Sequence, residues 1–321
     1  MTTSDRVPSH LRSVAQTLTR VLFRRPDADE LTPLPSRPTS RDEVPAEAWS
    51  ELERSCGDLA LERMLVILGT HKRTWIGGRL AMHTRVIAFG SRAVGQWTEG
   101  EGTGSVESMP IDDLLAIDDR TVLLHGRLSL IGTKGRIAIP YNTVARPQFR
   151  ESVLWLRRRM AGPELATRSS FVWIGAKGSE RSERELPYKW TYILACRDDL
   201  RIDPPANEMI AVGDVVEQTP FRTGPATGLA LLGPRELVIA AEPSDHIRLP
   251  RHGVDLTVVP RCHLRDVGWS RGNLRIRLRA GEGASEGAAD GPGDELAISR
   301  PLDGRLFEAM RQSFGDAVEW A

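Results

Sequence analysis

Cysteine is scarce in this sequence, and its three cysteines, Cys56, Cys196 and Cys262, lie far apart. An odd number of cysteines without a C-x-x-C spacing argues against a disulfide framework and against a zinc site built from thiolates. Such a chain suits a reducing compartment. We therefore expect a cytoplasmic protein, with peripheral attachment to the inner face of the membrane as the alternative.

Net charge and long apolar runs are lacking as well. The 43 basic and 43 acidic residues cancel, so no overall field draws the protein to nucleic acid or to an anionic membrane. The longest apolar runs, "LVIL" at 65–68 and "LALL" at 229–232, are far shorter than the roughly 20 residues that span a bilayer. Polar residues interrupt every apolar stretch before Val21, so we expect no secretory signal.

The sequence also lacks a convincing catalytic or metal-binding motif. The stretch "GAKGS" at 175–179 does not have the spacing of a phosphate-binding loop. The histidines and cysteine between 246 and 263 have no i, i+4 spacing. Adjacent aspartates in 112–119 point to opposite faces of a strand, so we expect turn or edge roles for them. These observations predict a protein that is not an enzyme and holds no metal and no cofactor; an enzyme on an unfamiliar β fold is the alternative.

The segment 1–44 combines an amphipathic helix with a proline-rich tether. Apolar residues recur at helical spacing in 10–25, and arginines flank them. The five prolines in 26–45 remove hydrogen-bond donors and disfavour regular structure. Such a helix docks on a protein, lies on an anionic membrane or, being short, stays disordered in water. The side chains that would face the partner or the membrane are those of Leu11, Val14, Leu18, Leu22 and Phe23.

The remaining chain contains one β-rich pattern twice. The stretches "SVESMPIDDLLAIDD" and "VDLTVVPRCHLRDVG" align with a shift of 150 residues, which superimposes Pro110 on Pro260. At the same shift Arg85 falls on Arg235. Each copy continues with short apolar segments separated by glycine and closes with an amphipathic helix. Because order, spacing and closing helix agree, we interpret the pattern as a duplicated unit.

Two copies predict two domains, at 45–162 and 206–321. The chain of 321 residues with 40% hydrophobic content is long enough to give each domain a core of its own. The residues between them, 163–205, contain the apolar stretches "FVWIG" and "WTYILACR". We interpret these two stretches as the strands of an added hairpin.

Both copies resemble the bacterial pleckstrin-homology-like and GRAM-like domains. "LAMHTRVIAFG" and "LALLGPRELVIAA" look like the early strand pair of that family, and "SMPIDDLLAID" and "TVVPRCHLRDVGW" look like its strand that begins with proline. The resemblance implies a mainly β, α+β fold of two bent antiparallel sheets or barrels, each closed by a C-terminal helix. It also implies a binding or scaffold module without catalytic residues, since members of this superfamily dock proteins or phospholipid head groups.

Basic residues in 69–79 lie where such domains have their first loop. Lys72, Arg73 and Arg79 are candidate ligands for a phosphate group, although a solvated turn has the same composition. The predicted function is a scaffold that docks a protein partner through its tandem domains. The alternative is peripheral binding to anionic phospholipid through the N-terminal helix and this basic loop. We expect no nucleic-acid partner, and the sequence leaves the oligomeric state open.

Overall fold

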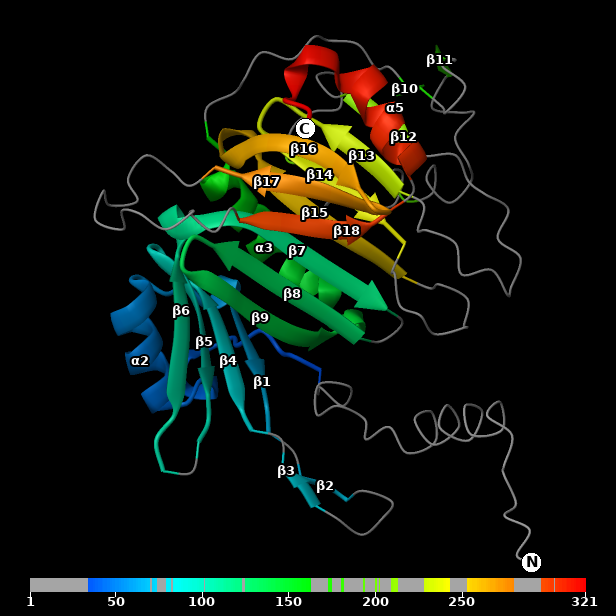
Figure 1. The fold of residues 1–321 in the computed structure, drawn as a ribbon. Helices are drawn as coiled ribbons and strands as arrows, with labels where there is room; N and C mark the ends of the chain where they lie inside the picture. The colour runs from blue at the N-terminus through cyan, green and yellow to red at the C-terminus, as the bar shows by residue number, and fades with distance from the viewer. Residues whose placement is uncertain are drawn as a thin grey trace, which may run out of the picture.

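A computed structural model shows the chain folded into antiparallel sheets with helices packed against them (Figure 1). Sheets of four, seven and three strands are accompanied by two short two-stranded ladders. The mainly β prediction is confirmed; in the described part of the chain each sheet is open and none closes into a barrel. The structure describes residues 34–69, 71–73, 79–81, 83–100, 102–122, 125–162, 173–174, 180–181, 193, 200, 202, 209–212, 228–242, 253–279, 296–302 and 304–321.

The first unit is a run of four strands, then three strands, then a helix. A hairpin of two short strands, β2 and β3, is inserted after the first strand, and helix α2 precedes the unit. The bounds are α2 Ala46–Cys56, β1 Met64–Ile67, β2 His71–Arg73, β3 Arg79–Ala81, β4 Arg85–Phe89, β5 Ala93–Thr98, β6 Ser105–Pro110, β7 Leu114–Val122, β8 His125–Gly132, β9 Gly135–Asn142 and α3 Arg146–Met160.

The second unit repeats this order of four strands, three strands and a helix. Two short strands, β10 and β11, lie between the units. The bounds are β10 Trp173–Ile174, β11 Glu180–Arg181, β12 Met209–Val212, β13 Gly228–Leu232, β14 Glu236–Ala241, β15 Gly253–Pro260, β16 Leu264–Ser270, β17 Asn273–Leu278, β18 Ala297–Pro301 and α5 Gly304–Phe314.

The duplication extends to the prolines that end the fourth strands. Pro110 and Pro260 share a φ of −56°, with ψ of 141° and 137°. Each precedes one 3-10 turn, and each following strand has a register irregularity, which starts at Leu114 in β7 and at Leu264 in β16. Proline suits this place because its φ is fixed near that value, and an irregularity bends the strand that carries it. The predicted superposition of the two prolines is confirmed.

Upstream of the prolines the predicted alignment is wrong. The backbone N–H of Ile111 donates to the carbonyl of Arg92 at 2.9 Å, and the N–H of Arg261 donates to the carbonyl of Arg235 at 2.8 Å. Arg92, and not Arg85, is therefore the counterpart of Arg235. The cause is a difference in connection length: the β14–β15 connection is longer than the β5–β6 connection, so one constant shift cannot hold across both.

The two units share one sheet. β15, the fourth strand of the second unit, pairs antiparallel with β7, the fifth strand of the first, and gives the order β12-β13-β14-β15-β7-β8-β9. The ladder runs from Gly253 opposite Val122 to Val258 opposite Ile117. The boundaries 45–162 and 206–321 stay a prediction, but the two segments are joined by main-chain pairing as well as by the chain itself.

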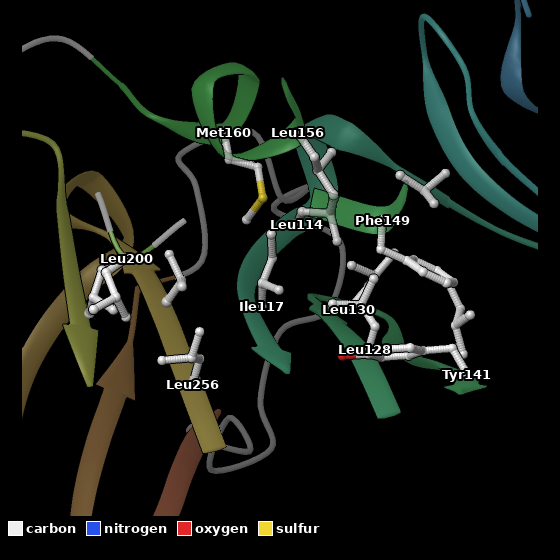
Figure 2. Packing of buried hydrophobic residues seen from close by; sticks show 14 of the residues in the cluster. Leu114, Ile117, Leu128, Leu130, Tyr141, Phe149, Leu156, Met160, Leu200 and Leu256 are labelled. Carbon is white, nitrogen blue, oxygen red and sulfur yellow. The ribbon is translucent and has the colours of Figure 1, made fainter. Parts of the chain in front are cut away.

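Three apolar layers stabilise this arrangement. α2 packs Ala48 and Leu52 on the outer face of the sheet β1-β4-β5-β6. α3 places Phe149 and Leu156 in one apolar layer with residues of the sheet β1-β4-β5-β6 and of one face of the seven-stranded sheet (Figure 2). α5 packs on the opposite face of β12 and β13. Since β13 and β14 are covered on both faces, the segments "GLALL" and "ELVIAA" are buried at every position, and Glu236 is their only charged residue.

The end of the predicted tether is anchored to the first unit, which corrects the tether prediction for residues 34–44. Ser36 and Val66 exchange two backbone hydrogen bonds of 2.8 Å, so the segment extends the edge of β1. Arg37 pairs with Glu151 of α3 at 2.8 Å and donates to the carbonyl of Gln148 at 2.9 Å. The predicted helix at 10–25 lies outside the described residues.

The predicted hairpin between the units is different in its second strand. Trp173 and Ile174 of "FVWIG" pair with Glu180 and Arg181 rather than with "WTYILACR". Ile193, within that second stretch, is helical and buried. A short apolar run fits a helix as well as a strand, and periodicity does not separate the two.

Candidate docking edges

The basic residues predicted to bind phosphate lie on the β2–β3 hairpin. The ladder places Arg73 opposite Arg79 and Lys72 opposite Leu80. The hairpin therefore brings the three residues together along the backbone, while their side chains lie outside the described part of the chain. The five helix residues Leu11, Val14, Leu18, Leu22 and Phe23 also lie outside it.

The edge of β7 in the first unit is paired with β15, a strand of the second unit. Six residues of β15 pair with six of β7. At the far end Thr121 adds a side-chain contact: its hydroxyl donates to the carbonyl of Val254 at 2.6 Å and accepts from the N–H of Val254 at 3.2 Å. Main-chain pairing supplies the attachment, and side chains such as Thr121 fix its register.

A buried carboxylate, that of Asp118, adds side-chain contacts between β7 and the second unit on one face of the sheet. Asp118 of β7 pairs with Arg136 at 3.0 Å and with Arg300 of β18, and Thr257 of β15 donates to it at 3.4 Å. Burial lowers the pKa of Arg136, with Arg127 nearby adding to the effect, and burial also lowers the pKa of Arg300. A guanidinium keeps its charge in proteins, so two cations from different units share one carboxylate.

On the other face of β7 a pocket opens beside α3. Its volume is about 440 Å³, including space open to solvent, and its walls come from β7, β8, β9, β15 and α3. Asp119 accepts from the hydroxyl of Tyr141 at 2.5 Å and pairs with Arg146 at 3.2 Å. Apolar residues form the floor, namely Ile117, Leu128, Phe149, Val153, Leu256 and Val258. The predicted opposite orientation of neighbouring aspartates is confirmed for Asp118 and Asp119, but the predicted turn or edge role is wrong for this pair, because β7 is an inner strand of the seven-stranded sheet.

No protein-family model matches this sequence, and no curated protein matches it significantly. The function must therefore be inferred from the geometry. No helix in the described ranges is long and apolar enough to cross a membrane.

The edge of β16 is the second unit's counterpart of the β7 edge. There the N–H of Val267 donates to the carbonyl of Glu319 at 2.9 Å, and the carbonyl of Val267 accepts from the N–H of Ala321 at 3.1 Å. Trp320 lies opposite Val267 in a parallel bridge. Counted from the two prolines, Val267 corresponds to Ile117, so Trp320 takes the place that Val258 takes in the first unit.

The edge of β6 differs from both. β6 pairs with β5, and within the described residues no strand pairs with its other edge. It exposes Ser105, Glu107 and Ser108. Because β6 corresponds to β15, it has the backbone of a docking strand but a polar surface.

Sequence reasoning missed these edges because strand pairing between units is non-local. A usable signal was present in the composition of the fourth strands: "VDLTVVP" of β15 has only Asp255 and Thr257 as polar residues, whereas half of "SVESMP" of β6 is polar, namely Ser105, Glu107 and Ser108.

Proposed function

We propose that this chain is a non-enzymatic scaffold with tandem pleckstrin-homology-like units that dock a protein partner by strand addition. The observation that carries the proposal is the β7–β15 ladder, in which one unit holds a strand of another along six residues beside its closing helix. Strand addition is a general mode of peptide recognition, with affinity from main-chain bonds and specificity from neighbouring pockets.

Two further observations support the pleckstrin-homology-like assignment. Each unit has four strands, three strands and a closing helix in the same order, and each changes sheet at a proline followed by one 3-10 turn. The proposal has the protein in the cytoplasm, as the scarcity of cysteine predicts. Among the terminal strands of the three larger sheets, the ones that this proposal assigns to a partner are β6 and β16, through their outer edges.

Site-specific photo-crosslinking of the full chain in its native host tests this function. A photoreactive amino acid is placed at Glu107 on β6, at Ser270 on β16 and, as a control, at Arg158, which is exposed on α3. The proposal predicts that one or both strand positions crosslink a reproducible protein that also binds in purified form, and that Arg158 does not. It is wrong if no position crosslinks a protein or if all three do so equally.

A second candidate is binding to anionic phospholipid, which the pairing of Arg73 with Arg79 on one hairpin favours. Two guanidinium groups on one hairpin suit a phosphate group. The test is flotation with vesicles containing phosphatidylserine, comparing wild type with the triple variant Lys72→Ala, Arg73→Ala and Arg79→Ala. Recovery of wild type but not of the variant with the vesicles supports this function; recovery of neither removes it.

A further inference from the structure

The edges of β7 and β16 are the same edge in two copies, and different segments occupy them. The first is covered by six residues of β15. The second is bridged at one residue, Val267, by the segment Glu319–Ala321. Beyond Val267, Trp269 and Ser270 are exposed. Within the described residues, the second edge is thus occupied over a much shorter length than its counterpart.

The side chain of Trp320 holds this segment in place. Its indole N–H donates to the carbonyl of Gly315 at 2.8 Å, just beyond the end of α5. Its ring packs edge-on against Phe307 of α5, with 5.6 Å between the ring centroids. The place therefore fits an aromatic ring that also carries a hydrogen-bond donor, which is the chemistry of tryptophan.

The absence of a side chain at Gly268 lets the backbone of another segment lie close to the edge of β16. A Cβ atom added at Gly268 would lie 3.2 Å from the carbonyl oxygen of Ala321, so a larger residue there would press on the segment. The counterpart of Gly268 in the first unit is Asp118, which instead carries the carboxylate shared by Arg136 and Arg300. Nearby, Trp269 is 41% exposed, so an apolar side chain lies beside the part of this edge that no described strand covers.

We propose that Glu319–Ala321 is an intramolecular stand-in for a partner. In the partner complex, an extended segment containing tryptophan displaces Glu319–Ala321, pairs with β16 and puts its indole on Phe307 in place of Trp320. The partner strand then continues along Trp269 and Ser270. This inference rests on the proposed strand-docking function and names the edge and the partner chemistry for it.

The test uses a fluorescently labelled hexapeptide with the sequence of residues 316–321, DAVEWA, and the full chain. In wild type the tethered segment competes at an effective concentration of the order of millimolar, so the peptide binds weakly. In Trp320→Ala the competitor loses its anchor, and we expect the peptide to bind at least ~10-fold more tightly. The peptide DAVEAA, which lacks the indole, should bind that variant at least ~10-fold more weakly than DAVEWA.

Two further variants keep the outcome interpretable. Ala321→Pro removes the N–H that bonds to Val267 and keeps the indole of Trp320, so it provides a milder release if Trp320→Ala does not fold. Arg311→Ala, on the exposed side of α5, is the matched control and should bind the peptide as wild type does.

Equal peptide affinity in wild type, Trp320→Ala and Ala321→Pro, or no binding to any folded variant, would overturn the inference. Its failure is distinct from failure of the docking function, because a partner crosslinked only at Glu107 of β6 leaves that function intact. Conversely, tight peptide binding with no partner crosslinked at either edge would support the site and remove the scaffold function.

Discussion

The first and second units follow the same strand order, yet their fourth strands lie in different surroundings. β6 lies at a sheet edge and exposes most of its residues, whereas β15 lies in the middle of seven strands with all but Gly253 buried. Both strands pair with the preceding strand in the same register, since Ala93 faces Pro110 as Glu236 faces Pro260. The side chains of these strands therefore distinguish an edge from a centre, while the backbone is shared.

The first four strands of the two units also differ in the helix that covers their outer face. In the first unit α2 covers this face through Ala48 and Leu52. In the second unit the face that contains Leu229 and Val238 packs in the layer that includes α3 of the first unit. This outer face is therefore covered by α2 in the first unit and by α3, which belongs to the first unit, in the second.

The largest expected effect on stability comes from a variant that breaks the contact between α3 and the second unit. Arg157 of α3 and Glu236 of β14 form a buried ion pair, and the counterpart of Glu236 in the first unit is Ala93. Removing one partner leaves a buried charge uncompensated, so Glu236→Ala should lower the free energy of unfolding by about 3–5 kcal/mol. Denaturant unfolding measures this loss.

The double variant Arg157→Met with Glu236→Ala is the control for this prediction. It removes both charges and should recover a large part of the lost free energy of unfolding. If the double variant is less stable than Glu236→Ala, the ion pair is not what joins α3 to β14.

A smaller effect is expected from exchanging one residue between the fourth strands. Val258 is buried opposite Ile117, and its counterpart Ser108 is exposed on β6. Val258→Ser removes buried methyl groups and leaves a hydroxyl in the core, which should cost about 2–3 kcal/mol in unfolding experiments.

The reverse exchange, Ser108→Val, should change stability by less than about 0.5 kcal/mol. It places a β-branched apolar residue on an open edge, so self-association measured by sedimentation should increase. Equal stability losses in the two exchanges would mean that β6 and β15 are not distinguished by their surroundings.

The comparison of the two units also shows which features the sequence could predict. The superposition of Pro110 on Pro260 followed from a local turn signal, which depends on proline φ and adjacent residues. The counterpart of Arg235 was misassigned because two arginine-containing segments both precede apolar strands. The β7–β15 ladder joins residues far apart in the chain, and local patterns do not specify such pairing. The pocket beside α3 has walls from both strands of that ladder, so it could not be predicted either.

The smallest effect concerns pH. Burial lowers the pKa of His263 below its ordinary value of 6.5, and a hydrogen bond that the imidazole donates to the backbone of Arg279 opposes this shift in part. The unfolded state therefore binds more protons just below pH 6.5, so the stabilisation by neutral His263 is present above that pH and lost as pH falls through the lowered pKa.

The variant His263→Phe should accordingly lose less stability between pH 7 and pH 5 than wild type does, as measured by denaturant unfolding at each pH. His83→Gln, at an exposed position, is the control variant for the loss of a histidine. An unchanged pH dependence in His263→Phe would contradict the assignment of this loss of stability to His263.

The central claim is that two copies of one edge are occupied to different extents, one permanently and one by a displaceable segment. Hydrogen exchange at the amides of Ile117 and Val267 in the full chain tests it most directly. The account predicts that the Ile117 amide exchanges only through global unfolding, whereas the Val267 amide, which donates to Glu319, exchanges through a local opening with a clearly lower free energy. Equal exchange free energies at the two amides would contradict it.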